Sequence, residues 1–275
     1  MAENFQLAAE FIESADGRLF CCHWRPQADN WSGHCLLVAA PFTEEMNRSR
    51  YMVTLLAQTL AEKGIGVVCV DALGTGDSEG DFVQSTWQSM VNAMHVASNV
   101  AASAGYRSTS VLGIRLGALV ALYAQSLIAN LKDFHFWQPL LDGKPMLTQM
   151  LRVKMAASLN RAEDKGSTRI FEQQIAAGQP VEVSGYAISP TLFGELNEVN
   201  HQKADVPSCP IHWYSILPSA DRQPGRADLK IQQSWAQLNK QFVTHSIIGP
   251  AFWQAHERTL VPELVAATAT QVASR

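Results

Sequence analysis

Residues Ser108 to Ala118, STSVLGIRLGA, constrain the fold of this chain more than any other stretch. An apolar run ends at Gly113, and the stretch that follows, ALVALYAQSLIANL, is apolar enough for a buried helix. This order predicts a strand, a tight turn and a helix. The middle of the turn is Arg115, which stays protonated and has no free lone pair. The residue that the turn presents therefore cannot act as a nucleophile.

Two other stretches belong with this turn. Residues 36–50 read LLVAAPFTEEMNRSR, and residues 71–80 read DALGTGDSEG. Together with residues 113–117 they resemble the α/β-hydrolase superfamily: its third strand and loop, its D-x-x-G-x-G-x-S-x-G turn, and its G-x-S-x-G turn with arginine in place of serine. The resemblance covers nearly the whole chain. It implies an α/β-hydrolase fold: a mostly parallel eight-stranded sheet with helices on both faces and a cap insertion.

A narrower resemblance rests on four segments, PFTEEMNRSR, GIRLGA, FWQPLLDGK and GPAFWQ. They resemble the second of two hydrolase-like proteins associated with bacterial exosortase-A and exopolysaccharide systems. This resemblance implies a role in such a system, with a protein partner in polysaccharide export. The subfamily is named a hydrolase for its fold, so the resemblance leaves open whether the protein is an enzyme.

The composition favours a soluble globular protein, with 47% apolar and 17% charged residues. A net charge of −4 offers no basic stripe for nucleic acid. No apolar run approaches the ~18–20 residues of a membrane span, and the first residues, MAENFQLAAEF, do not resemble a secretory signal. We therefore expect a cytoplasmic protein whose membrane contacts, if any, go through a partner.

Cofactor and metal signals are weak. The five cysteines are odd in number and lie mostly in strand-like runs, which favours buried reduced thiols over a disulfide framework. No Cys/His spacing suggests zinc. The glycines within residues 74–80 do not open onto a helix in the dinucleotide-binding pattern. The sequence therefore predicts no metal and no cofactor.

The chain order matches a parallel sheet that follows an antiparallel hairpin. Apolar runs predict strands at 5–13, 17–25, 34–40, 65–70, 108–112, 133–137, 211–217 and 242–248. Helical spacing predicts helices at 50–63, 84–104 and 229–240, with a closing helix from Phe252 or Pro262. Residues 140–208 break this alternation, as a cap insertion does. We therefore assign residues 1–139 and 209–275 to the core and 140–208 to the cap.

A catalytic triad on this fold needs an acid and a histidine after the later strands. Asp221 lies where the acid would be, although it is also a good turn residue. His256 is the histidine beyond the last strand and is predicted on a helix, whereas His245 lies inside a strand. Ser78 is a hydroxyl at a motif position, but the matching serine of the superfamily usually braces its loop. These three residues, Ser78, Asp221 and His256, are the catalytic candidates.

Arg115 can bind rather than attack. At a helix N-terminus, a guanidinium adds a planar fork suited to carboxylate or phosphate. The resemblance places oxyanion-hole donors at the Leu116 and Phe42 N–H groups, and it turns Glu44 and Glu45 toward Arg115. Either carboxylate could neutralise the arginine and plug the site, because a buried unpaired arginine would be costly. The sequence leaves both the ligand-facing and the plugged arrangement open.

Three hypotheses follow. The first is a protein of an exopolysaccharide system that binds an anionic or acylated small molecule at Arg115, with little or no ester hydrolysis. The second is an active esterase or acyl hydrolase with an atypical nucleophile. The third is a non-catalytic partner of another protein.

Overall fold

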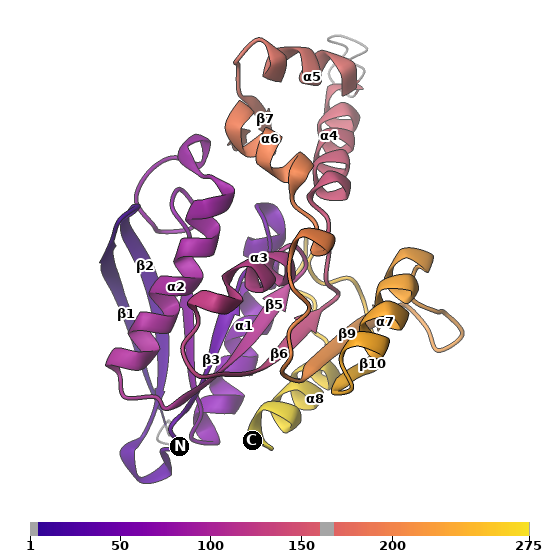
Figure 1. Cartoon of the computed structure of the whole chain (residues 1–275). Coiled ribbons are helices and arrows are strands. Elements are labelled where there is room, and N and C mark those ends of the chain that lie inside the picture. Colours follow the sequence, from indigo (N-terminus) through magenta and orange to yellow (C-terminus); the bar gives the residue numbers. More distant parts are fainter. Residues whose placement is uncertain (1–4, 160–167, 275) are drawn as a thin grey trace.

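The computed structural model describes residues 5–159 and 168–274 (Figure 1). Its centre is an eight-stranded sheet in the order β1-β2-β4-β3-β5-β6-β9-β10. The strands are β1 (Phe5–Ser14), β2 (Gly17–Pro26), β3 (His34–Ala39), β4 (Gly66–Val70), β5 (Ser108–Ile114), β6 (Leu131–Trp137), β9 (Ile211–Leu217) and β10 (Phe242–Ile248). β1 and β2 pair antiparallel, β2 joins β4 antiparallel, and the strands from β4 to β10 run parallel. The predicted mostly parallel eight-stranded sheet is confirmed.

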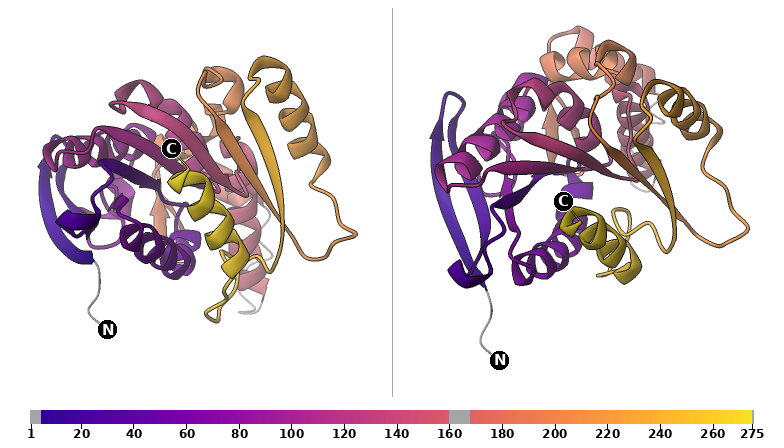
Figure 2. Two further views of the ribbon diagram at one scale, coloured as in Figure 1. Left: turned by 90° about the horizontal axis from the view of Figure 1, so that it is seen from below. Right: turned by 60° about the horizontal axis from the view of Figure 1, so that its bottom comes forward.

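Helices cover both faces of the sheet. α1 (Glu44–Glu62) and α8 (Pro262–Ala273) lie side by side on one face (Figure 2). α2 (Trp87–Ser103), α3 (Gly117–Ala124) and α7 (Arg226–Leu238) belong to the other side. Strand β6 serves both cores, because Phe134 and Phe136 pack with the α2 side and Trp137 packs with the α1 side. Burial on both faces explains the continuous apolar runs of the central strands.

One predicted helix boundary was wrong, and one of two predicted alternatives is confirmed. α1 begins at Glu44, six residues before the predicted start, because two acidic residues in its first turn suit the positive end of the helix dipole. The closing helix begins at Pro262 and not at Phe252. Phe252 instead lies in a turn and packs its ring into the core beside Trp137.

The segment between β6 and β9 stands apart from the sheet, at the top of Figure 1. It contains α4 (Gly143–Leu159), α5 (Thr168–Ala176), the hairpin β7 (Val181–Val183) and β8 (Tyr186–Ile188), and α6 (Pro190–Glu198). The Tyr186 hydroxyl accepts a hydrogen bond from Asn47 of α1 (2.9 Å), and Glu195 accepts one from the Trp87 N–H (2.7 Å). These bonds fix the cap segment to the two helices that flank the sheet edge.

Two further observations concern the chain as a whole. None of the helices in the described ranges is both long and apolar enough to cross a membrane. The five cysteines carry free thiols, with Cys21 and Cys35 buried and the others partly buried.

Candidate functional site

Strained backbone marks the carboxyl edge of the sheet. Thr43 follows β3 with φ 53°, Arg115 follows β5 with φ 54°, and Gln138 follows β6 with φ 40°. Positive φ is unfavourable for residues with a side chain, costing about 1–3 kcal/mol each, and such residues gather at ligand and active sites. Because these three strands are neighbours in the sheet, the strained residues lie beside one another.

The turn at Arg115 depends on its two glycines. A Cβ at Gly113 would collide with Ala118 of α3, and a Cβ at Gly117 would collide with the carbonyl of Ala39. The strand, the helix and the neighbouring strand therefore approach more closely than any larger residue allows. The strand–turn–helix predicted from the sequence is confirmed.

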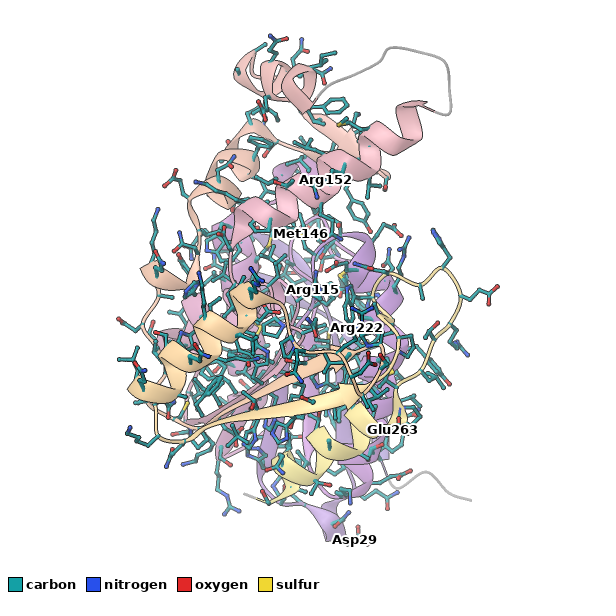
Figure 3. All side chains as sticks on the ribbon, turned by 90° about the vertical axis from the view of Figure 1, so that its right-hand side faces the viewer. Asp29, Arg115, Met146, Arg152, Arg222 and Glu263 are labelled. Atoms are coloured by element: carbon teal, nitrogen blue, oxygen red, sulfur yellow. The ribbon has the colours of Figure 1, made fainter. Side chains whose placement is uncertain are left out.

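The Arg115 side chain is buried and paired. The residue is only 8% exposed, and its Nε lies 3.3 and 3.4 Å from the two carboxylate oxygens of Glu45. Nη1 donates to the Gln138 carbonyl at 3.1 Å, and the guanidinium carbon lies 5.0 Å from the centroid of the Trp253 ring. Charge, hydrogen bond and aromatic face together hold the cation in place. Figure 3 shows Arg115 where the cap segment, at Met146, meets the core.

Glu45 links this pair to the cap. Burial raises the pKa of the Glu45 carboxyl, and the nearby Arg115 opposes that rise. Gln149 of α4 donates to the same carboxylate at 3.4 Å. Arg115 also acts on Asp228 of α7: burial raises the pKa of the Asp228 carboxyl, and the charge of Arg115 opposes part of that rise. The arginine thus lies among groups from α1, α4, α7 and the loop after β10.

Backbone donors beside Arg115 remain available. Within the described residues, neither the Leu116 N–H nor the Phe42 N–H has a hydrogen-bond acceptor. Both residues line a small cavity of about 50 Å³ whose other walls are mostly apolar. Those walls include Thr43, Met46, Met90, Met94, Gly117 and Val120. A carbonyl or anionic oxygen could be received there, with an apolar group beside it.

Comparison with known proteins identifies the fold. Est1E from Butyrivibrio proteoclasticus, with bound ferulic acid, matches with a TM-score of 0.66 at 15% identity, over 97% of this chain and 100% of that chain. An esterase from Pyrococcus furiosus matches with a TM-score of 0.64 at 14% identity, over 98% and 91%. The chain has the α/β-hydrolase fold.

Sequence comparison agrees with this fold but matches a smaller part of the chain. The model of the X-Pro dipeptidyl-peptidase (S15) family matches residues 16–104. None of the curated protein sequences matches the chain.

A third solved structure is also similar. A thioesterase domain from the curacin biosynthetic pathway matches with a TM-score of 0.57 at 15% identity, over 98% of this chain and 100% of that domain.

The α/β-hydrolase triad positions after β9 and β10 carry no assembled acid and base. Asp221 lies in an exposed turn and accepts a hydrogen bond from the Ser219 hydroxyl (2.6 Å), which holds the pKa of Asp221 below its usual range. His256 is exposed in a loop, so its predicted helix was wrong. Residues 252–253 turn into the core and bring the Trp253 ring to Arg115. An indole N–H is only a donor and cannot serve as a base.

Two other sequence candidates are occupied elsewhere. The Ser78 hydroxyl donates to the Asp71 carbonyl (2.6 Å) and accepts from the Phe20 N–H (2.8 Å), which braces the loop after β4. Glu44 is half-exposed and lies 3.7 Å from Arg48, so only Glu45 of the two candidates contacts Arg115. Sequence analysis missed Gln138 and Gln149; only Gln138 had a signal, its place directly after a predicted strand.

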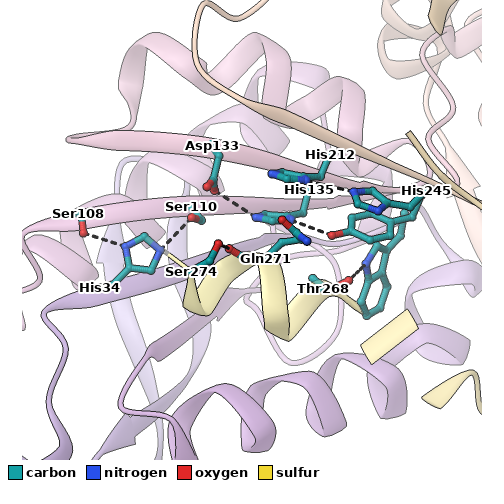
Figure 4. A network of polar contacts seen from close by, with 12 residues as sticks. His34, Ser108, Ser110, Asp133, His135, His212, His245, Thr268, Gln271 and Ser274 are labelled. Carbon is teal, nitrogen blue, oxygen red and sulfur yellow. Dashed lines mark hydrogen bonds and ion pairs between the residues drawn. The ribbon is translucent and has the colours of Figure 1, made fainter. Parts of the chain in front are cut away.

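Three strand histidines, His135, His212 and His245, form a network in the sheet (Figure 4). His135 lies 3.2 Å from Asp133 and stacks on His212, with ring centroids 4.9 Å apart. His212 in turn contacts His245 of the edge strand at 3.1 Å between ring nitrogens. The network lies within β6, β9 and β10, on the side of the sheet near α8, rather than at the carboxyl edge where Arg115 lies. It therefore places no imidazole at the site.

Proposed function

We propose that this protein binds an anionic or acylated small molecule at Arg115 without hydrolysing esters. The observation that carries the proposal is the buried Arg115, which pairs with Glu45 and lies over the ring of Trp253. In this proposal, Arg115 stands where the resemblance places the nucleophile, and Trp253 lies in the loop where it places the base; the guanidinium of one lies over the ring of the other. Such a pair suits binding and positioning rather than acyl transfer.

The ligand would use donors that the protein leaves available. The Arg115 Nε donates to Glu45, and its Nη1 donates to the Gln138 carbonyl. Its Nη2 has no acceptor within the described ranges. A carboxylate or phosphate oxygen could bind Nη2, and a second oxygen could reach the Leu116 and Phe42 N–H groups. The apolar cavity beside them would take a short acyl group.

The cellular context is a further part of the proposal. The stretches around Arg115, Gln138 and Trp253 resemble the hydrolase-like proteins of exosortase-associated systems, so we propose a role in bacterial exopolysaccharide assembly. A cytoplasmic location and a protein partner in export go with that role. The cap segment offers exposed apolar side chains for such a partner, at Val153 and Ile170.

A fluorophosphonate probe tests the absence of hydrolysis. Such probes label activated serines, and we expect no labelling because, among the described residues, no hydroxyl at the carboxyl edge of the sheet has a histidine beside it. Labelling measured by in-gel fluorescence should equal that of heat-denatured protein. A serine esterase in the same experiment gives the positive control. Labelling that disappears in the Ser78→Ala variant would support the active hydrolase instead.

Binding can be measured with hexanoate, a short acyl anion. We expect saturable binding by isothermal titration calorimetry, and at least tenfold weaker binding for Arg115→Lys. Lysine keeps the charge that Glu45 needs but loses the planar fork that serves two partners and a ligand together. Hexanamide, which lacks the charge, is the matched ligand. Equal affinity of the wild type and Arg115→Lys would contradict binding at Arg115.

A further inference from the structure

A second cavity, of about 220 Å³, lies between α1 and the β1–β2 hairpin. Its sheet walls are Phe20, Cys22 and Trp24 of β2, and its helix walls include Met46 and Val53 of α1. Leu7 of the edge strand β1 also lines the cavity, and this residue is 51% exposed to solvent. An apolar cavity that reaches the surface in this way suits an aliphatic chain.

A polar groove adjoins the cavity along α1. The groove has a volume of about 520 Å³ and runs between α1 and the loop that carries His256 and Arg258. Arg50 and Thr54, one helical turn apart, line both the groove and the apolar cavity. The two hollows therefore meet at these side chains.

Arginine donors dominate the groove. Arg50 donates from Nη2 to the buried Asp71 at 2.7 Å, and Arg48 donates from Nη1 to the Gln254 carbonyl at 2.8 Å. The Arg258 guanidinium lies 3.8 Å from the centroid of the Tyr51 ring. A guanidinium has five N–H donors, so each of the three keeps donors for another partner.

The groove also contains carboxylates. Glu44 lies 3.7 Å from Arg48, and Glu257 is a further lining residue, so the groove is lined by three arginines and two glutamates. Several planar guanidinium groups around one groove match the oxygens of a phosphate, which can accept hydrogen bonds from more than one arginine.

We propose that the cavity and the groove form one binding site for an anionic amphiphile, an aliphatic chain with a phosphate head group. The chain would lie between α1 and the hairpin, and the phosphate would contact Arg50 and Arg258. The site is separate from Arg115 and does not depend on the function proposed there. Both sites are carried by α1, whose first turn holds Glu45 and whose second holds Arg50.

Decyl phosphate, used below its micelle concentration, is the probe. Isothermal titration calorimetry should show saturable binding, at least tenfold tighter than that of either inorganic phosphate or decanol. The reason is that each of these lacks one half of the ligand. Inorganic phosphate binding as tightly as decyl phosphate would reduce the site to a surface anion site and overturn the proposal. Equal binding of decanol would overturn the role of the arginines.

Matched variants locate the binding. Leu7→Asp puts a carboxylate at the rim and should weaken decyl phosphate binding at least tenfold, whereas Val243→Asp, on the opposite edge strand β10, 43% exposed and outside the cavity, should change it less than twofold. Arg258→Gln should weaken binding about fivefold, with Arg222→Gln, another exposed loop arginine, as its control. Equal losses in variants and controls, or no loss in either variant, would refute the site.

Fluorescence gives an independent readout. Decyl phosphate with a bromine at its terminal carbon should quench Trp24 fluorescence, and Trp24→Phe should lose that quenching while keeping decyl phosphate affinity within threefold. Arg115→Lys should leave both measurements unchanged, which separates this site from the one proposed for hexanoate. Quenching that persists in Trp24→Phe would place the chain elsewhere and contradict the proposal.

Discussion

Replacing Arg115 with serine should lower the free energy of unfolding by about 3–5 kcal/mol near neutral pH, the usual scale for breaking a buried ion pair from one side. Glu45, 5% exposed, would lose its ion-pair partner and keep the 3.4 Å hydrogen bond from Gln149 and the weaker influence of Arg48. Chemical denaturation at pH 7 measures the loss. Stability equal to that of the wild type would contradict the importance of the buried pair.

The pH dependence of that loss has a definite sign. Burial already raises the pKa of Glu45, and removing Arg115 takes away the group that opposes the rise most. Between the unfolded and folded pKa values the folded state binds more protons, so stability falls as pH rises. The deficit of Arg115→Ser should therefore be smaller at pH 5 than at pH 8. Glu45→Gln in the Arg115→Ser background should recover part of the loss and remove this pH dependence.

The same serine variant should remain inactive toward p-nitrophenyl esters, although it rebuilds G-x-S-x-G. The loop after β10 brings Trp253 toward position 115, where an indole cannot take a proton, and His256 is exposed in that loop. Serine-dependent turnover would show that another residue acts as the base. Comparison of Arg115→Ser with Arg115→Ala under identical conditions distinguishes such turnover from background hydrolysis.

The sequence could predict the turn at Arg115 but not its partner. The turn follows from glycine spacing and an apolar run, which are local properties of the chain. The choice between Glu44 and Glu45 depends on α1 starting at Glu44, because successive helical side chains point about 100° apart. A helix placed from residue 50 left both carboxylates in a loop, where either could face the arginine.

Contacts from distant segments were beyond sequence reasoning. Trp253 reaches Arg115 because Phe252 and its neighbours pack into the core beside α8 instead of forming a helix. Gln149 reaches Glu45 only through the way the cap segment sits on the core. Tertiary packing determines both, and no periodicity or motif in the chain encodes them locally.

Lowering the pH from 7 to 4.5 should cost the folded protein about 2–3 kcal/mol through His23 alone. This histidine is fully buried in β2, and burial, with help from Arg25, lowers its pKa from 6.5 to about 4. Its Nδ1 accepts a hydrogen bond from Arg25 Nε (2.9 Å), and its Nε2 lies 3.0 Å from the Tyr106 hydroxyl. A proton on Nδ1 would therefore point at a guanidinium donor.

The sign follows from proton binding in the two states. Between pH 6.5 and about 4 the unfolded chain binds a proton at His23 that the folded protein does not, so stability is complete above pH 6.5 and is lost as pH falls. Burial lowers the pKa of His245 as well, so lowering the pH destabilises the wild type through more than one histidine. The contribution of His23 is isolated by comparing urea unfolding of the wild type and His23→Gln at pH 7 and pH 4.5. We expect the free energy of unfolding of His23→Gln to fall by about 2–3 kcal/mol less than that of the wild type over this range. The control is His95→Gln, which alters an exposed histidine on α2 and should lose as much stability as the wild type. Parallel losses in all three proteins would mean that His23 is protonated in the folded state at a higher pH than its buried position allows.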